Sequence, residues 1–165
     1  MGRLKFEVNL PSLFGKKTIA NFKLDKKFFE FSDYFLIDNY SVDCAVVIEK
    51  KNAFWQLDVE IRGLANTYCD RCGDPLLLKL KGSDVYFLKK EDDGSSQSHN
   101  VIYITHSTEP VNLESVLKEV LFFVIPKTKV HKENDCNLDV LKKLDSYQKK
   151  NNKNFLSDYL KGKLK

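Results

Sequence analysis

Four side chains suited to binding a metal lie in two short segments of the sequence. Cys69 and Cys72 are separated by two residues in Asn66-Thr-Tyr-Cys-Asp-Arg-Cys-Gly-Asp-Pro75, a spacing that lets both thiols reach one metal ion or each other. The segment His131-Lys-Glu-Asn-Asp-Cys136 adds an imidazole and a third thiol. Two such pairs suit a tetrahedral ion, so we predict a structural zinc site formed by Cys69, Cys72, His131 and Cys136. Asp135 is an alternative ligand, because carboxylate oxygen also binds zinc.

Two other interpretations of the Cys-x-x-Cys pair stay open, namely inert thiols in a surface turn and a redox-active dithiol. A thioredoxin-like dithiol begins a helix after a strand, whereas Gly73-Asp-Pro75 and a further strand follow here. Four protein ligands describe a closed site with no position for an activated water. We find no Gly-rich phosphate loop, nucleophile elbow or suitably spaced carboxylate pair, and therefore expect no enzymatic activity and no small-molecule substrate.

Alternating apolar and polar residues predict the strands that must position the first ligand pair. The runs Val42–Ile48 and Trp55–Ile61 form a hairpin around a turn at Lys50. The second of these strands continues towards the thiols, and alternation resumes at Leu76 after the turn. Cys69 and Cys72 are thus expected at the tip of a second hairpin, as in a zinc knuckle. Further strands are expected at Leu4–Asn9, Lys17–Lys23, Asp84–Leu88 and Val101–Ile104.

Helical periodicity begins only in the last third of the chain. Apolar residues recur at helical spacing from Leu113 to Val124, with Asn112 as N-cap and Pro126 as the stop, and a shorter helix is expected from Leu138 to Tyr147. The predicted class is α+β, with an antiparallel sheet or partly closed barrel of hairpins in the N-terminal two thirds. An amphipathic helix and a lysine-rich helical tail follow. We expect one domain over residues 1–147, a mobile loop at Lys89–Asn100 and a basic tail over 148–165.

Composition indicates a soluble globular protein. The chain has 165 residues, of which 42% are hydrophobic and 30% charged, enough for one domain with its own core. No apolar run is long enough for a membrane helix, and the first residues lack the apolar core of a signal peptide. Four cysteines, two of them closely paired, are typical of a metal or redox site and not of a secreted disulfide framework. We therefore expect a cytoplasmic protein without membrane contact.

The positive charge is concentrated at the C-terminal end. Residues 127–165 contain eleven lysines and five acidic residues, a net charge of +6, so the net +4 of the whole chain leaves −2 for residues 1–126. One interpretation is a solvated tail. The other is contact with RNA phosphates, in which lysine without arginine favours diffuse contact over base reading. The candidate RNA contacts in this segment are Lys127, Lys129, Lys142, Lys143, Lys149, Lys150 and Lys153, with Tyr147 and Phe155 interleaved.

The order of motifs resembles the YceD family, the large ribosomal RNA subunit accumulation proteins of bacteria and plastids. The resemblance covers about Trp55 to Cys136. It rests on Tyr68-Cys-Asp-Arg-Cys-Gly-Asp-Pro-Leu76, on Val111-Asn-Leu-Glu-Ser-Val-Leu-Lys-Glu-Val-Leu-Phe-Phe-Val-Ile-Pro126, and on Val130-His followed by Cys136. Some members carry a further Cys-x-x-Cys-Gly after the last of these motifs, which this chain lacks.

The resemblance implies a non-enzymatic factor needed for large-subunit ribosomal RNA accumulation or processing and for ribosome assembly. Its expected partners are that RNA, a large-subunit ribosomal protein, or both. Cys69, Arg71 and Cys72 would be the family signature, with Arg71 a further candidate RNA contact, and His131 and Cys136 would be the second ligand pair. The alternative is a protein-interaction adaptor that docks through Phe122, Phe123 and the tail without touching RNA.

Overall fold

The structure, a computed structural model, describes residues 6–29, 37–90, 100–104, 110–132 and 135–149. The chain forms two compact units. The first contains residues 1–67 and 77–127, and the second contains residues 68–76 and 128–165. The second unit thus combines the Cys-x-x-Cys turn from the middle of the chain with the segments that follow the helix.

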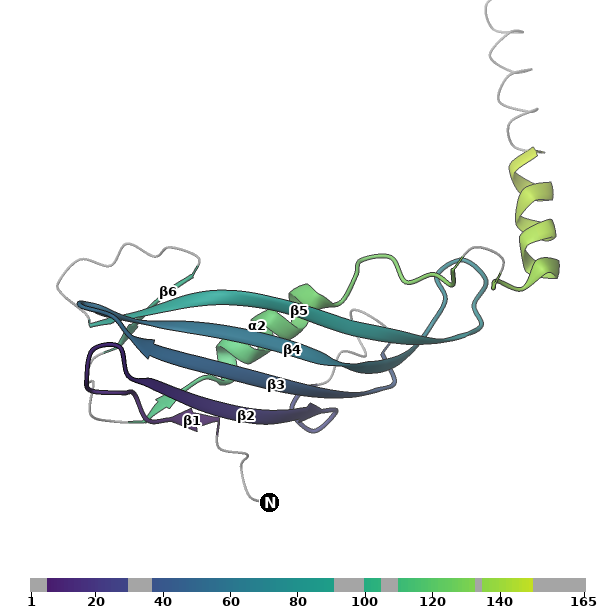
Figure 1. The fold of residues 1–165 in the computed structure, drawn as a ribbon. Coiled ribbons are helices and arrows are strands. Elements are labelled where there is room, and N and C mark those ends of the chain that lie inside the picture. Colours follow the sequence, from purple (N-terminus) through teal and green to yellow (C-terminus); the bar gives the residue numbers. More distant parts are fainter. Residues whose placement is uncertain (1–5, 30–36, 91–99, 105–109, 133–134, 150–165) are drawn as a thin grey trace, which may run out of the picture. The chain divides into compact units, whose positions relative to one another are not determined.

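A five-stranded sheet dominates the first unit, in the order β2-β3-β4-β5-β6 (Figure 1). The hairpin between β3 and β4 is confirmed by its antiparallel register, in which Val46 faces Val59. Strand β5 is one continuous strand that includes both the alternating run beginning at Leu76 and the separate strand expected at Asp84–Leu88. The bounds are β2 Lys17–Asp25, β3 Asn39–Lys50, β4 Phe54–Tyr68, β5 Pro75–Lys90 and β6 Val101–Ile104.

Of the two predicted alternatives, an antiparallel sheet and a partly closed barrel, the structure has the open sheet. The expected antiparallel pairing was wrong for β6, which runs parallel to β5, with Phe87 facing Val101. Alternation along a strand reports which side chains face the core, but it is identical for parallel and antiparallel neighbours. It therefore could not reveal that the chain begins β6 beside Phe87 and runs in the same direction as β5.

Helix α2 (Glu114–Val124) lies across one face of this sheet (Figure 1) and buries the apolar residues that gave it its periodicity. A Cβ atom on Gly82 of β5 would lie 2.5 Å from Cγ2 of Val124, so glycine is required where strand and helix meet. The helix begins one residue later than expected, and the Asn112 Oδ1 atom accepts a hydrogen bond from the Glu114 amide at 2.8 Å. Asn112 also belongs to β7 (Val111–Asn112), a strand that the sequence pattern did not predict. Strand β7 pairs with β1 (Glu7–Val8), which lies within the strand expected at Leu4–Asn9.

The second unit contains the turn between β4 and β5 and a helix over residues 138–149, close to the expected range. Neither helix in the described part of the chain has both the length and the apolar character needed to cross a membrane. Several expected features lie outside the described residues. These are most of the loop at Lys89–Asn100 and, from position 150 onward, the basic tail.

Candidate metal centre

The first two cysteines lie on a tight turn at the end of the β4–β5 hairpin, as predicted for a knuckle. Strand β4 ends at Tyr68 and β5 begins at Pro75. The Cys69 amide donates to the Asp74 carbonyl at 2.9 Å, and the Gly73 amide donates to the Cys69 carbonyl at 2.8 Å. Gly73 has φ +79°, a left-handed conformation that side chains with a Cβ adopt only at a cost. The turn thus explains why glycine follows Cys72.

The structure brings together the four side chains that the sequence predicted as ligands. One potential ligand atom from each lies within 4.8 Å of all the others. The Cys69 and Cys136 Sγ atoms are 3.8 Å apart, and the His131 Nδ1 atom lies 3.4 Å from Cys72 Sγ and 3.9 Å from Cys136 Sγ. Tetrahedral zinc bonds of about 2.3 Å to sulfur and about 2.0–2.1 Å to nitrogen require edges of about 3.8 Å and about 3.6 Å, respectively. The cluster therefore fits a single tetrahedral metal ion.

The orientation of the His131 ring is fixed from outside the cluster. Its Nε2 atom lies 3.1 Å from the carbonyl oxygen of Pro75, to which an Nε2–H group can donate. The tautomer with hydrogen on Nε2 leaves the lone pair of Nδ1 directed at the thiols. A carbonyl that holds the outer nitrogen of a metal-binding histidine is a recurrent feature of such sites.

Backbone amides surround the sulfur atoms of Cys69 and Cys72. Burial raises the pKa of Cys69, but backbone hydrogen bonds outweigh it and bring the pKa down to about 6; the donors are the amides of Cys72, His131 and Arg71. The amide of Asn137, followed by that of Asp74, lowers the pKa of Cys72. The thiolate form, which is the form that binds metal, is thus stabilised at two positions.

The pKa values of Cys136 and His131 are both raised. Burial is the largest cause, and the neighbouring sulfur atoms of Cys69 and Cys72 the next, that together raise the pKa of Cys136 to about 11. The hydrogen bond with Cys72 is the largest cause that raises the pKa of His131. A divalent cation at the centre would neutralise charge that the protein alone leaves concentrated among buried sulfur atoms.

Asp70, between the two cysteines, ties the turn to the segment that carries His131. The Asp70 amide donates to the Lys129 carbonyl at 2.7 Å, and the Asp70 carboxylate accepts from the Lys129 amide at 2.6 Å. The His131 amide lies 3.4 Å from Cys69 Sγ, to which it donates. These contacts align the two segments side by side and place His131 next to the thiols.

The helix over residues 138–149 begins beside the cluster. Asn137 follows the ligand Cys136, and its Oδ1 atom accepts hydrogen bonds from the amides of Asp139 at 3.1 Å and Val140 at 3.4 Å. This is an N-cap arrangement. Val140 and Leu141 of the first turns pack with Leu76 against the three buried cysteines. Asp135, the alternative ligand, is exposed and is not part of the ligand group.

The predicted RNA contacts divide into three groups. Arg71, Lys127, Lys142, Lys143 and Lys149 are exposed. Lys129 is instead buried, with its side chain 7% exposed and its amine 3.4 Å from the Asp70 carboxylate. That pairing gives Lys129 a structural position and makes its amine unavailable to phosphates. Lys150 and Lys153 lie outside the described residues.

Sequence reasoning missed three residues that support the site, namely Asp70, Pro75 and Asn137. Asn137 precedes a helical apolar pattern, so its capping role could have been recognised. The Asp70 contact to Lys129 and the Pro75 carbonyl contact to His131 depend on tertiary placement and left no local signal.

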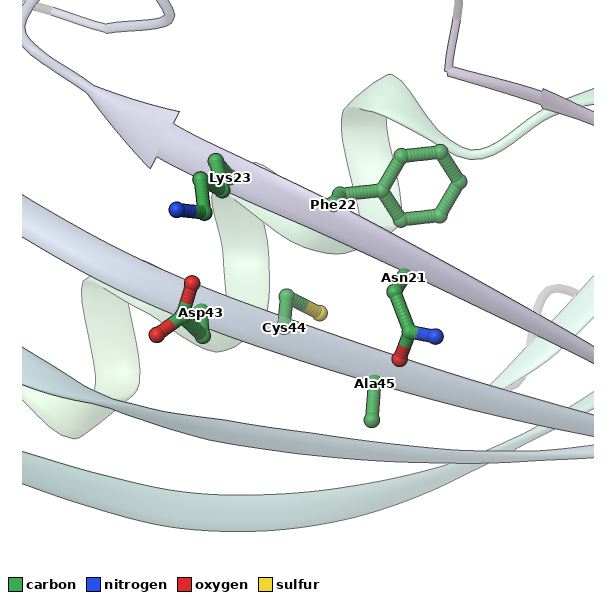
Figure 2. Close-up of a pocket in the computed structure, with 6 residues that line it drawn as sticks. All are labelled: Asn21, Phe22, Lys23, Asp43, Cys44 and Ala45. Carbon is green, nitrogen blue, oxygen red and sulfur yellow. The ribbon is translucent and has the colours of Figure 1, made fainter.

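A separate hollow of ≈ 380 Å³ lies along β2 and β3 (Figure 2). Lys23 and Asp43 face each other in its lining, as do Phe22 and Cys44. Burial raises the pKa of Cys44 to about 12, so this thiol is neutral and behaves as a core residue. The residues described along this hollow include no group of metal ligands.

Comparison with known proteins gave no match to a family model, a curated protein or a solved structure.

Proposed function

We propose that this protein is a non-enzymatic, zinc-stabilised factor that supports accumulation and processing of large-subunit ribosomal RNA and ribosome assembly. The observation that carries the proposal is the Cys3His geometry, in which His131 and Cys136 approach the Cys-x-x-Cys turn at the edge lengths of a zinc tetrahedron. The order of motifs in the sequence, which resembles the YceD family, supports the ribosomal assignment. Zinc is the proposed ion because three thiols and one imidazole form one of its common structural ligand sets.

In this proposal the metal has a structural role. Cys72 and His131 are 59 residues apart in the chain, and a bound ion would link their segments while offsetting the entropy of closing that loop. Asp70, Lys129, Pro75 and Asn137 orient the ligands. All four coordination positions are filled by side chains, which supports a structural site over a catalytic one.

RNA contact is proposed through the exposed cationic side chains. Their positive charge would neutralise backbone phosphates, and the resulting affinity would fall as salt rises. Lys129 is omitted from this set because of its buried pairing with Asp70. The proposed contacts are Arg71, Lys127, Lys142, Lys143 and Lys149, together with Lys150 and Lys153 from the sequence.

A second candidate function is that of an adaptor that binds a ribosomal protein without touching RNA. The side chains at the end of α2 favour it, because Phe123 is 67% exposed and Phe122 is 43% exposed. Large apolar side chains at neighbouring exposed positions are common at protein interfaces.

Purification of the tagged protein from its own cells, at low and then moderate salt, tests both functions. We expect large-subunit ribosomal RNA that remains after ribosomal proteins are removed and that is lost as salt rises. One ribosomal protein retained after nuclease treatment, without bound RNA, would instead support the adaptor. Elemental analysis of the same sample should find one zinc per chain, and its absence from a stable protein would contradict the zinc centre.

A further inference from the structure

The helix over residues 138–149 depends on the metal-ligand cluster for its tertiary contacts. Val140 and Leu141 pack against the cysteines, and Asn137 joins the N-cap directly to the ligand Cys136. From position 142 to position 149, every residue is exposed. Isolated helices shorter than about 12–15 residues are marginal in water, so the docked first turns must supply most of the stability.

The exposed half of this helix combines charge with an aromatic ring. Lys143 and Tyr147 are four residues apart and therefore neighbours on the helix surface, and Tyr147 is 65% exposed. Lys142 and Lys149 are seven residues apart and share a second row. Among the described residues, the only ion pair of this half joins Lys142 to Asp139, at 3.9 Å between two exposed side chains, which leaves the charge accessible.

Lysines beside an exposed aromatic ring suit a single-stranded nucleic acid. Lysines follow the phosphates, while an unpaired base can stack on the tyrosine ring. Duplex RNA keeps its bases paired and stacked, so it would use the lysines and leave the ring without a partner. The charge and the exposed ring together thus favour single-stranded RNA over duplex RNA on this surface.

We propose that the helix over residues 138–149 is a contact surface for single-stranded RNA, and that it forms only when the Cys3His site holds its metal. This inference rests on the proposed function and names both the form of the RNA and the condition for binding it. The metal holds Cys136 next to Cys69 and thereby fixes the start of the helix. Without it, nothing would hold Cys136 beside Cys69, and the docking surface for Val140 and Leu141 would loosen.

Fluorescence anisotropy with the full zinc-loaded chain tests the first half, using a labelled single strand and the same strand in a duplex. Tyr147→Ala should weaken single-strand binding about tenfold, the scale of one stacked base, and leave duplex binding unchanged. Tyr147→Phe should bind as well as the wild type, because stacking needs only the ring. The control is Tyr68→Ala, since Tyr68 is 45% exposed on the hairpin and not on the helix.

Zinc removal by a chelator tests the second half. Far-ultraviolet circular dichroism should show a loss of helix, and single-strand affinity should fall with it and return when zinc is added. Unchanged affinity without zinc would overturn the metal requirement. Salt-sensitive binding that ignores Tyr147 and does not distinguish the two RNA forms would overturn the single-strand surface but leave the proposed function standing. Absence of RNA binding in every form would contradict both.

Discussion

The Asp70 carboxylate accepts a hydrogen bond from the Lys129 amide and lies 3.4 Å from the Lys129 amine, while the Asp70 amide donates to the Lys129 carbonyl. Asp70→Ala would keep the bond between the two backbones but remove both carboxylate contacts, and it would leave a lysine that is 7% exposed without its counter-ion. We expect a loss of about 2–3 kcal/mol in unfolding free energy, allowing for partial solvent exposure of the carboxylate. Urea denaturation of the zinc-loaded protein measures it.

The double variant Asp70→Ala/Lys129→Met should regain part of this loss, because a buried methionine needs no counter-charge. Lys127→Met, at an exposed position, is the control and should change stability little. Equal losses in the single and double variants would show that the lysine charge is not what makes Asp70 necessary.

Gly73 provides a second prediction, about the turn that carries Cys69 and Cys72. An added Cβ atom would meet nothing within 4 Å, so Gly73→Ala costs only the left-handed backbone conformation, about 1 kcal/mol. Because the turn must form for the metal to bind, we expect weaker zinc affinity in a competition assay with a chromophoric chelator. Gly15→Ala is a matched control, since Gly15 has φ +71°, open space and no link to the ligands. It should reduce stability equally and leave zinc affinity unchanged.

The ligands could be predicted from the sequence because two spacing patterns act at short range. Cys69 and Cys72 are close by chain connectivity, and His131 and Cys136 are also near one another. The contact between the two pairs, which are separated by 59 residues from Cys72 to His131, was inferred from ligand chemistry, and the structure brings all four side chains together. The exchange between Asp70 and Lys129 could not be inferred in this way, because an isolated Asp and Lys are among the commonest surface residues.

Much of the fold could also be predicted from the sequence, since the alternation of apolar and polar residues located β3 and β4 and the helical period located α2. The errors concern features without periodicity. The two-residue strand β7 is too short to alternate, and the parallel pairing of β6 with β5 depends on the course of the connecting chain. Lys129 was predicted as an RNA contact from its charge alone. Its burial could not be foreseen, because the charge of a residue in the sequence gives no information on whether the side chain is exposed.

Two buried tyrosines supply a third prediction. Tyr86 is 1% exposed, and its hydroxyl has no partner with hydrogen-bond geometry among the described residues, although the carboxylates of Glu119 and Asp84 lie near enough to add to the rise in its pKa that burial causes. The Tyr40 hydroxyl, by contrast, donates to the Phe29 carbonyl at 2.8 Å. A buried hydroxyl without a partner costs free energy, so Tyr86→Phe should leave stability unchanged or raise it by up to about 1 kcal/mol. Tyr40→Phe should lower it by about 1 kcal/mol. Thermal unfolding measures both, and a marked loss in Tyr86→Phe would show that its hydroxyl is bonded in solution.

Cys44 should be unreactive towards alkylating reagents in the folded protein. Burial raises the pKa of Cys44 to about 12, above that of an unfolded thiol, so its neutral form is favoured in the folded state. The stability this gives is complete below the unfolded pKa and is lost as pH rises towards the folded value. At pH 8, iodoacetamide should therefore leave Cys44 unlabelled until the protein unfolds. Mass spectrometry of digested samples identifies the labelled residue, and rapid labelling of Cys44 in the folded protein would contradict its burial.

Replacing individual cysteines tests the metal centre directly. Cys69→Ser removes a proposed zinc ligand whose sulfur accepts backbone hydrogen bonds, so we expect loss of bound zinc and a lower melting temperature. Cys44→Ser is the matched control, because it also alters a buried thiol but lies in the core of the first unit. It should reduce stability through packing alone and retain one zinc per chain. Cobalt substitution gives an independent measurement, since tetrahedral thiolate coordination produces visible absorption that Cys69→Ser should diminish and Cys44→Ser should preserve. Equal zinc content in the two variants would show that Cys69 is not a ligand.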